Sequence, residues 1–212
     1  MKMNNTYIFD FDGVIADSMP TWARIMVEIL DENNVSYPEN IIEIITPLGL
    51  KRTAEYFATL GIKEKAPEEI LGMIYEKMLY AYQNVIVIKP YVKEKLEQLK
   101  MNGASLNILT ASPHPMLDPC LKRNGIFELF DNLWSCDDFN LPKSETPIYF
   151  EAAKLLGKDV SECIFFDDNI NNVVAAKKAG LFVYGVYDET SKDAQHEIEN
   201  ACDKYIFDFS QI

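Results

Sequence analysis

From Pro90 to the C-terminus, short apolar runs alternate with amphipathic stretches. Apolar runs of this length predict buried strands, whereas apolar residues spaced three or four positions apart predict helices. The predicted strands are 106–109, 133–134, 163–166, 181–187 and an edge strand at 206–207. One predicted helix runs from Val92 to near Gly103, and others cover 116–124, 146–156 and 173–179. Thr146 followed by Pro147 is typical of an N-cap and a first helical residue.

Residues 18–86 carry a different pattern, with apolar residues at helical spacing and no strand-like alternation. The spaced apolar positions are Trp22, Ile25, Met26 and Ile29, and further on Ile70, Ile74, Met78 and Ala81. Helix-breaking residues separate them, at Pro38, Pro47, Gly49 and Gly61. The segment therefore predicts several helices around a small core of their own.

The apolar run Tyr7–Phe9 near the N-terminus predicts one more strand. Strands that are apolar nearly throughout and alternate with helices are typical of a doubly wound, Rossmann-like parallel sheet. We therefore expect an α/β core made of residues 1–17 and 87–212, with an inserted all-helical cap at 18–86. Ligands of such sheets bind beyond the carboxyl ends of the strands, so we expect the cap near that end.

Composition and charge narrow the class of protein. The chain has 212 residues, 48% of them hydrophobic, which suits one large domain or a domain with a smaller insert. A net charge of −13 opposes binding to nucleic acids and to anionic membranes, because both are polyanions. The four cysteines form no CxxC pair, and no apolar run approaches the ~20 residues that span a bilayer. We expect a cytoplasmic protein, monomeric or a small homo-oligomer, without nucleic-acid or membrane partners.

Two carboxylates follow the first strand, in the sequence Asp10-Phe11-Asp12-Gly13. Strand periodicity would point Asp10 and Asp12 to the same side, where like charges repel unless a cation or a shared proton offsets them. A fold does not need this arrangement for stability, whereas a metal-assisted active site does.

Polar and charged residues also follow the other predicted strands. Thr110 ends the second strand, Lys143 lies in the loop after the third, and Asp167 and Asp168 end the fourth. Singly, each has a simpler explanation, such as a turn former, a helix cap or a solvated loop cation. Together at one edge of a sheet, they indicate a catalytic site.

Phosphoryl transfer through an aspartyl-phosphate would use this set of groups. An attacking carboxylate needs a cation to offset repulsion from the phosphate, and Mg²⁺ bound by oxygen ligands fits. A second carboxyl group would protonate the leaving oxygen, and a hydroxyl and an ammonium would bind the phosphate oxygens.

The same residues resemble the four motifs of the haloacid dehalogenase superfamily, over essentially the whole chain. The chain is similar to the branch that contains phosphoglycolate phosphatases and β-phosphoglucomutase. The matching segments are Asp10-Phe11-Asp12-Gly13-Val14-Ile15, Thr110, Lys143, and Asp167-Asp168 followed by Ala175–Gly180. Ala111, Ser144 and Asn169 depart from residues that are common in the family at those positions.

The resemblance implies a role for each matching residue. Asp10 would be the nucleophile and Asp12 the general acid and base. Mg²⁺ would be held by Asp10, the backbone carbonyl of Asp12 and Asp168, with Asp167 as a further ligand or an outer partner. Thr110 and Lys143 would bind the phosphoryl group. These roles imply a Mg²⁺-dependent phosphatase that acts on a small phosphorylated metabolite.

The helical caps of such relatives supply substrate contacts. The best local candidates are Lys51 and Arg52, which follow the turn at Gly49, and a functional Arg52 would meet a second anionic group of the substrate. Cations on the surface of an amphipathic helix are the alternative.

Other functions remain open on the residues alone. A phosphomutase of the β-phosphoglucomutase type shares the core chemistry and differs only in the fate of the phosphoenzyme. A catalytically silent binding protein would be expected to have lost one of these groups. A phosphorylation-dependent receiver module places its acidic pair before the acceptor aspartate, and the order Asp10, Thr110, Lys143, Asp168 argues against it.

Overall fold

The computed structural model of this chain describes residues 6–62 and 65–212. They form two compact units. The first joins the N-terminal segment up to Ser18 to Ile86–Ile212, and the second is Met19–Val85. That the first unit is a catalytic core and the second its cap stays a prediction.

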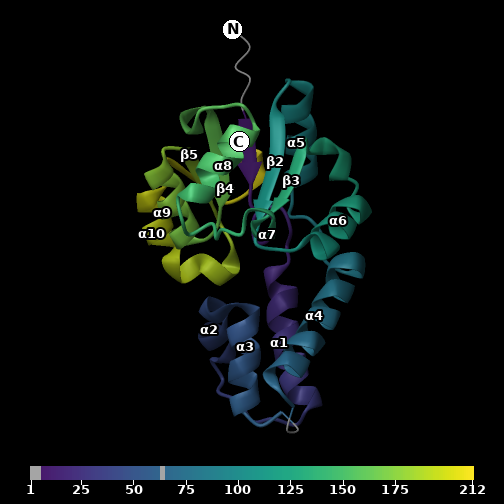
Figure 1. Cartoon of the computed structure of the whole chain (residues 1–212). Coiled ribbons are helices and arrows are strands. Elements are labelled where there is room, and N and C mark those ends of the chain that lie inside the picture. Colours follow the sequence, from purple (N-terminus) through teal and green to yellow (C-terminus); the bar gives the residue numbers. More distant parts are fainter. Residues whose placement is uncertain (1–5, 63–64) are drawn as a thin grey trace. The chain divides into compact units, whose positions relative to one another are not determined.

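A six-stranded sheet forms the centre of the first unit, in the order β3-β2-β1-β4-β5-β6 (Figure 1). All five strand pairs are parallel. The strands are β1 (Thr6–Phe9), β2 (Ser105–Thr110), β3 (Asn132–Ser135), β4 (Cys163–Asp167), β5 (Phe182–Val186) and β6 (Lys204–Ile206). The chain winds outward from β1 in both directions, so the predicted doubly wound sheet is confirmed.

Helices cover both faces of this sheet (Figure 1), which explains why β1 is buried at all four of its residues. On one face, Ile8, Phe165 and Val183 pack in a cluster with three helices. These helices are α8 (Pro147–Leu155), α9 (Ile170–Ala179) and α10 (Gln195–Ala201).

Aromatic rings fill the other face. The ring of Phe166 stacks on Phe9 with centroids 4.8 Å apart and on Tyr184 at 4.5 Å. Phe209, from the 3-10 turn η5 (Phe209–Gln211), closes this cluster. Offset stacking of such rings adds to the free energy of burying them.

The remaining helices of the unit are α5 (Val92–Met101), α6 (His114–Arg123) and the short α7 (Cys136–Phe139).

The strand register brings the carboxyl ends of β1, β2 and β4 to the same level. Phe9 pairs with Ile108 on one side and with Phe166 on the other. Asp10, Thr110 and Asp167 follow those pairs within one or two residues, so the sheet delivers them to one edge.

The second unit is helical in its described residues, as predicted. Its helices are α1 (Met19–Glu32), α2 (Ile41–Ile45), α3 (Gly49–Thr59) and α4 (Pro67–Asn84). The apolar positions spaced along α4 are buried: Ile70, Ile74, Met78 and Ala81. Lys77 of α4 lies 2.8 Å from Glu32 at the end of α1, which joins the two helices at their surface.

The two segments that connect the units pair with each other inside the first unit. Asp17 donates its N–H to the carbonyl of Val87, and Lys89 donates its N–H to that of Ile15, both at 2.9 Å. An antiparallel bridge joins Ala16 to Ile88 between them. The chain therefore leaves and re-enters the first unit at one place.

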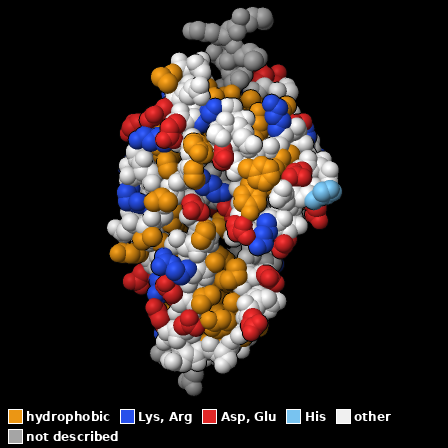
Figure 2. Space-filling model, turned by 180° about the vertical axis from the view of Figure 1, so that it is seen from behind, with side chains coloured by type: hydrophobic (Ala, Val, Ile, Leu, Met, Phe, Trp, Pro, Cys, Tyr) orange, Lys and Arg blue, Asp and Glu red, His pale blue; other side chains and the backbone are white. Residues whose placement is uncertain are grey.

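On the face in Figure 2, Lys and Arg side chains are scattered among acidic and hydrophobic ones and form no basic patch. Within the described residues, no helix combines the length and the apolar character needed to cross a membrane.

Candidate active site

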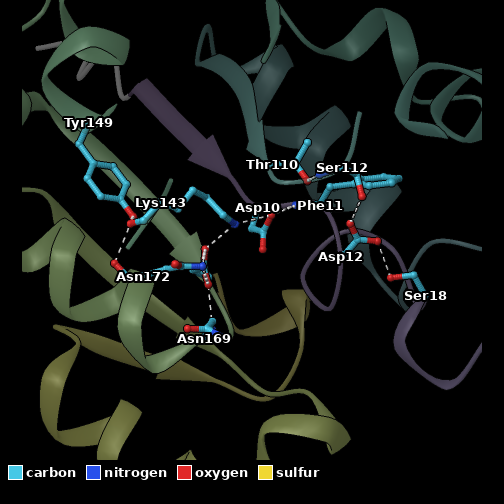
Figure 3. A network of polar contacts seen from close by, with 11 residues as sticks. Asp10, Phe11, Asp12, Ser18, Thr110, Ser112, Lys143, Tyr149, Asn169 and Asn172 are labelled. Carbon is cyan, nitrogen blue, oxygen red and sulfur yellow. Dashed lines mark hydrogen bonds and ion pairs between the residues drawn. The ribbon is translucent and has the colours of Figure 1, made fainter. Parts of the chain in front are cut away.

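Asp10, Lys143 and Asp167 form a buried ion-pair triad at the end of β1. Lys143 Nζ lies 2.6 Å from Oδ1 of Asp10 and 2.8 Å from Oδ2 of Asp167. The Lys143 side chain is 4% exposed, and the hydroxyl of Tyr149 donates to its backbone carbonyl at 2.6 Å. Oδ1 of Asp10 also accepts the N–H of Phe11 at 2.7 Å. The predicted site residues from three separate segments therefore meet (Figure 3).

Asp167 is held more completely than Asp10. It is fully buried, and its Oδ1 accepts the N–H of Asn169 at 2.8 Å and the side-chain amide of Asn172 at 3.1 Å. Its other oxygen contacts Lys143. These partners leave Asp167 well suited to orient the lysine.

A three-carboxylate cluster adjoins the triad. One oxygen from each of Asp10, Asp167 and Asp168 lies within 4.8 Å of the others. Gly13 packs against the carboxylate of Asp168, because a Cβ at Gly13 would lie only 2.5 Å from Oδ2 of Asp168. The φ of Gly13 is +75°, in the left-handed region that favours glycine.

The cluster carries more negative charge than Lys143 neutralises. Burial raises the pKa of Asp10 to about 7 against the opposing effect of Lys143, and the charges of Asp167 and Asp12 add to the rise. Burial also raises the pKa of Asp168 well above its usual range, with Asp167 and Asp10 contributing. Burial alone would lower the pKa of Lys143, but Asp10 and Asp167 raise it well above its usual value.

This donor set fits a divalent cation with a preference for oxygen. Carboxylate oxygens are the ligands that Mg²⁺ takes in proteins. A cation would also offset the burial and the carboxylate repulsion that raise the pKa values of Asp10 and Asp168. The cluster of acidic groups is thus present where the strand ends predicted it.

Asp12 has a different environment from Asp10. Its Oδ1 accepts the hydroxyl of Ser18 and its Oδ2 accepts that of Ser112, each at 2.6 Å. In the view of Figure 3, Lys143 approaches Asp10 from one side, and Asp12 with its two serines lies on the other. The expectation that strand periodicity points Asp10 and Asp12 to the same side is wrong, because β1 ends at Phe9 and both residues lie beyond the strand.

Thr110 is fully buried at the end of β2. Its hydroxyl oxygen accepts the N–H of Ser112 at 3.0 Å and so shapes the loop that brings Ser112 to Asp12. Accepting this bond leaves the Thr110 hydroxyl able to donate its own proton.

Lys51 and Arg52 lie in the first turn of α3, in the second unit, where both are exposed. Sequence reasoning missed Ser18, Ser112 and Asn172. Ser112 stands two residues after Thr110 and Asn172 five after Asp167, so closeness to a predicted site residue was the available signal.

A model of the haloacid dehalogenase-like hydrolases matches residues 5–180 of the chain. Hexitol phosphatase B of Escherichia coli (strain K12) is 25% identical over 82% of this chain and 79% of its own length. A phosphoglycolate phosphatase of Haemophilus influenzae is 28% identical over 84% of this chain and 83% of its own. The crystal structure of a β-phosphoglucomutase from Clostridium difficile has the same fold, with a TM-score of 0.73, 21% identity, and coverage of 98% of this chain and 92% of that one.

Proposed function

The chain belongs to the haloacid dehalogenase-like hydrolase family, as a hydrolase of the phosphatase kind, and we propose that it is a Mg²⁺-dependent phosphatase of a small phosphorylated metabolite. The observation that carries this proposal is the carboxylate of Asp10, 2.6 Å from the Lys143 ammonium and within the acidic cluster at the end of β1. The phosphatase names of its relatives support the same chemistry.

In the first half-reaction, a carboxylate oxygen of Asp10 attacks the phosphorus of the substrate. The bond from phosphorus to the ester oxygen breaks, and Asp12, as a carboxylic acid, gives its proton to that oxygen. Lys143 offsets the repulsion between Asp10 and the phosphate, and Thr110 donates its hydroxyl proton to a phosphate oxygen.

In the second half-reaction, the Asp12 carboxylate takes a proton from water, and the water oxygen attacks the phosphorus of the aspartyl-phosphate. The bond from phosphorus to the Asp10 oxygen breaks, which releases inorganic phosphate and restores the carboxylate. Ser18 and Ser112 hold both oxygens of Asp12 and thereby orient it for the two proton transfers.

Asp10 and Asp168 would hold Mg²⁺, with the backbone carbonyl of Asp12. Asp167, fully buried and bonded to Lys143 and two asparagines, would act mainly as an outer partner. The bound cation supplies positive charge that stabilises the phosphoryl oxygens during transfer. Substrate contacts of Lys51 and Arg52 stay a prediction.

A panel of phosphorylated metabolites and a chromogenic phosphate ester tests the proposal. Wild-type protein is expected to release phosphate with Mg²⁺ and to stop with a chelator. Asp10→Asn should lose at least about a thousandfold in kcat, because it removes the nucleophile. The exposed Asp137→Asn, on α7, is the matched control and should retain wild-type turnover.

Two outcomes would change the conclusion. Equal turnover by Asp10→Asn and wild type would reject Asp10 as the nucleophile. Interconversion of a sugar phosphate without net release of phosphate would favour a phosphomutase instead.

A further inference from the structure

A second lysine, Lys89, lies close to the acidic cluster and has no part in the steps above. Its side chain is 16% exposed. Its ammonium donates to the backbone carbonyls of Gly13 and Tyr187, the latter at 2.9 Å, and lies 2.8 Å from Oδ2 of Asp188. An ammonium has three protons, so three acceptors satisfy it.

Lys89 joins two loops of the first unit. Gly13 directly follows Asp12 after β1, whereas Tyr187 and Asp188 directly follow β5, the neighbour of β4. The Lys89 backbone is itself fixed, because its N–H donates to the carbonyl of Ile15. The ammonium therefore connects the loop after β1 to the loop after β5. In the sheet, β4 with its acidic end lies between these two strands.

Asp188, the acidic partner of Lys89, is itself buried and held by hydrogen bonds. Its side chain is 4% exposed. Its Oδ1 accepts both the N–H of Thr190, at 2.9 Å, and the Thr190 hydroxyl. Its Oδ2 contacts Lys89, so each oxygen of this buried carboxylate has a partner. A buried ion pair of this kind changes the free energy of folding little while both partners are present. Removal of one partner strongly destabilises the protein.

The Gly13 end of this connection touches the acidic cluster. Gly13 packs so closely on Asp168 that a single added carbon would clash with the carboxylate. Any displacement of Gly13 therefore changes how the loop after Asp12 faces Asp168. Lys89 limits that displacement by bonding to the Gly13 carbonyl.

We propose that Lys89 is a positioning residue for Mg²⁺ binding, which holds Gly13 against Asp168 by tying its carbonyl to Tyr187 and Asp188. This inference rests on the proposed function. Lys89 acts through Gly13 and contacts neither the substrate nor the reacting atoms. Residues that hydrogen-bond directly to metal ligands change metal affinity about 10–100-fold when they are removed, and we expect the low end of this range for Lys89, because it acts through Gly13.

Lys89→Met combined with Asp188→Asn tests the proposal without changing the net charge. Mg²⁺ is titrated into ¹⁵N-labelled protein, and the amide signal of Gly13 reports binding independently of activity. The Mg²⁺ dependence of phosphatase activity is measured in parallel. The dissociation constant for Mg²⁺ should rise about tenfold, while kcat at saturating Mg²⁺ changes much less.

Two further variants keep the test decisive. Lys89→Arg retains the charge, but a planar guanidinium does not reproduce three bonds from one nitrogen, so Mg²⁺ should again bind more weakly. This variant also serves if the double variant does not fold. The matched control is Lys100→Met with Asp131→Asn, a surface pair between α5 and the residue before β3, which should bind Mg²⁺ as the wild type does.

If the wild-type protein binds Mg²⁺ and both Lys89 variants bind it with the same affinity, the positioning role of Lys89 is wrong. The proposed function would then still stand. A wild-type protein whose spectrum does not respond to Mg²⁺ would overturn the proposed function, and the role of Lys89 with it.

Discussion

The ammonium of Lys143 lies 2.6 Å from Oδ1 of Asp10, although the two residues belong to different loops at the edge of the sheet. Both side chains are nearly buried, so neither charge is fully compensated by water. The same ammonium contacts Asp167. One cation thus contacts two buried carboxylates, and we expect its removal to change the stability of the protein as well as the proposed catalysis.

We expect Lys143→Met to destabilise the metal-free protein by about 3–5 kcal/mol, because it leaves the buried carboxylates of Asp10 and Asp167 without their cationic partner. Urea unfolding at pH 7.5 measures this loss. Lys100→Met removes an exposed ion pair with Asp131 and should cost no more than about 1 kcal/mol. Equal losses in the two variants would contradict the burial argument.

The stability of the metal-free protein should fall as pH rises from about 4 to 7. Burial raises the pKa of Asp10 to about 7 and also raises that of Asp168, so the folded protein keeps protons that the unfolded chain releases near pH 4. The rise for Asp10 alone corresponds to a loss of about 3 kcal/mol over this range, and the rise for Asp168 adds to it.

Urea unfolding in EDTA across this range tests the prediction. Asp10→Asn is the control, because it removes the Asp10 carboxyl group and should make the decline shallower. Excess Mg²⁺ should offset the decline for the wild type, since the cation then replaces the protons. Superimposable profiles for wild type and variant in EDTA would refute the assignment.

Gly13→Ala should damage the site beyond its effect on the backbone. Both Gly13 and Gly157 have positive φ, at +75° and +63°, so alanine at either position costs about 1–2 kcal/mol. A Cβ at Gly157 meets no atom within 4 Å, whereas one at Gly13 clashes with Asp168. Turnover should therefore fall about 100-fold for Gly13→Ala only. Similar kinetics in the two variants would count against the packing of Gly13 on Asp168.

The pKa of His114 should lie above its ordinary value. Its Nδ1 lies 3.1 Å from Asp118 and its Nε2 3.0 Å from Asp138. Asp118 has the largest effect in raising the pKa of His114, followed by Asp138, against the effect of burial. The stabilisation is fully present below about pH 6.5, the unfolded value, and is lost as pH rises through the folded pKa.

NMR titration of the His114 ring, assigned with His114→Gln, measures this shift. Asp118→Asn should lower the pKa of His114 more than Asp138→Asn does. The stabilisation should stay below about 1 kcal/mol, because the pair is partly exposed. An unchanged pKa in Asp118→Asn would disprove the assigned cause.

The order of elements could be predicted because most strands of the sheet contain a short apolar run, as β1 and β4 do. The run at 163–166 became β4 and the edge strand at 206–207 became β6, within a residue or two. Local detail was harder. The helix α8 begins at Pro147 as expected, but the side chain of Thr146 makes no capping bond, because its backbone is already helical.

The residues that hold the site together could be predicted only in part. Asp10 and Asp167 stand at the ends of β1 and β4, so topology alone brings these two together, whereas Lys143 comes from the loop that follows α7. The hydroxyls on Asp12 come from Ser18 and Ser112, and Lys89 reaches Gly13 from a third segment. Such bonds depend on the conformation of the loops that follow the strands. The pattern of hydrophobic and polar residues does not predict that conformation.

The pairing of residues 15–17 with 87–89 gives the protein a modular architecture. The two connecting segments lie side by side. The whole of Met19–Val85 is therefore inserted into the first unit at a single point. Insertion or replacement of that segment would leave the order of the sheet strands unchanged. The chemistry of the acidic strand ends and the sequence of the inserted helices can therefore change independently during evolution.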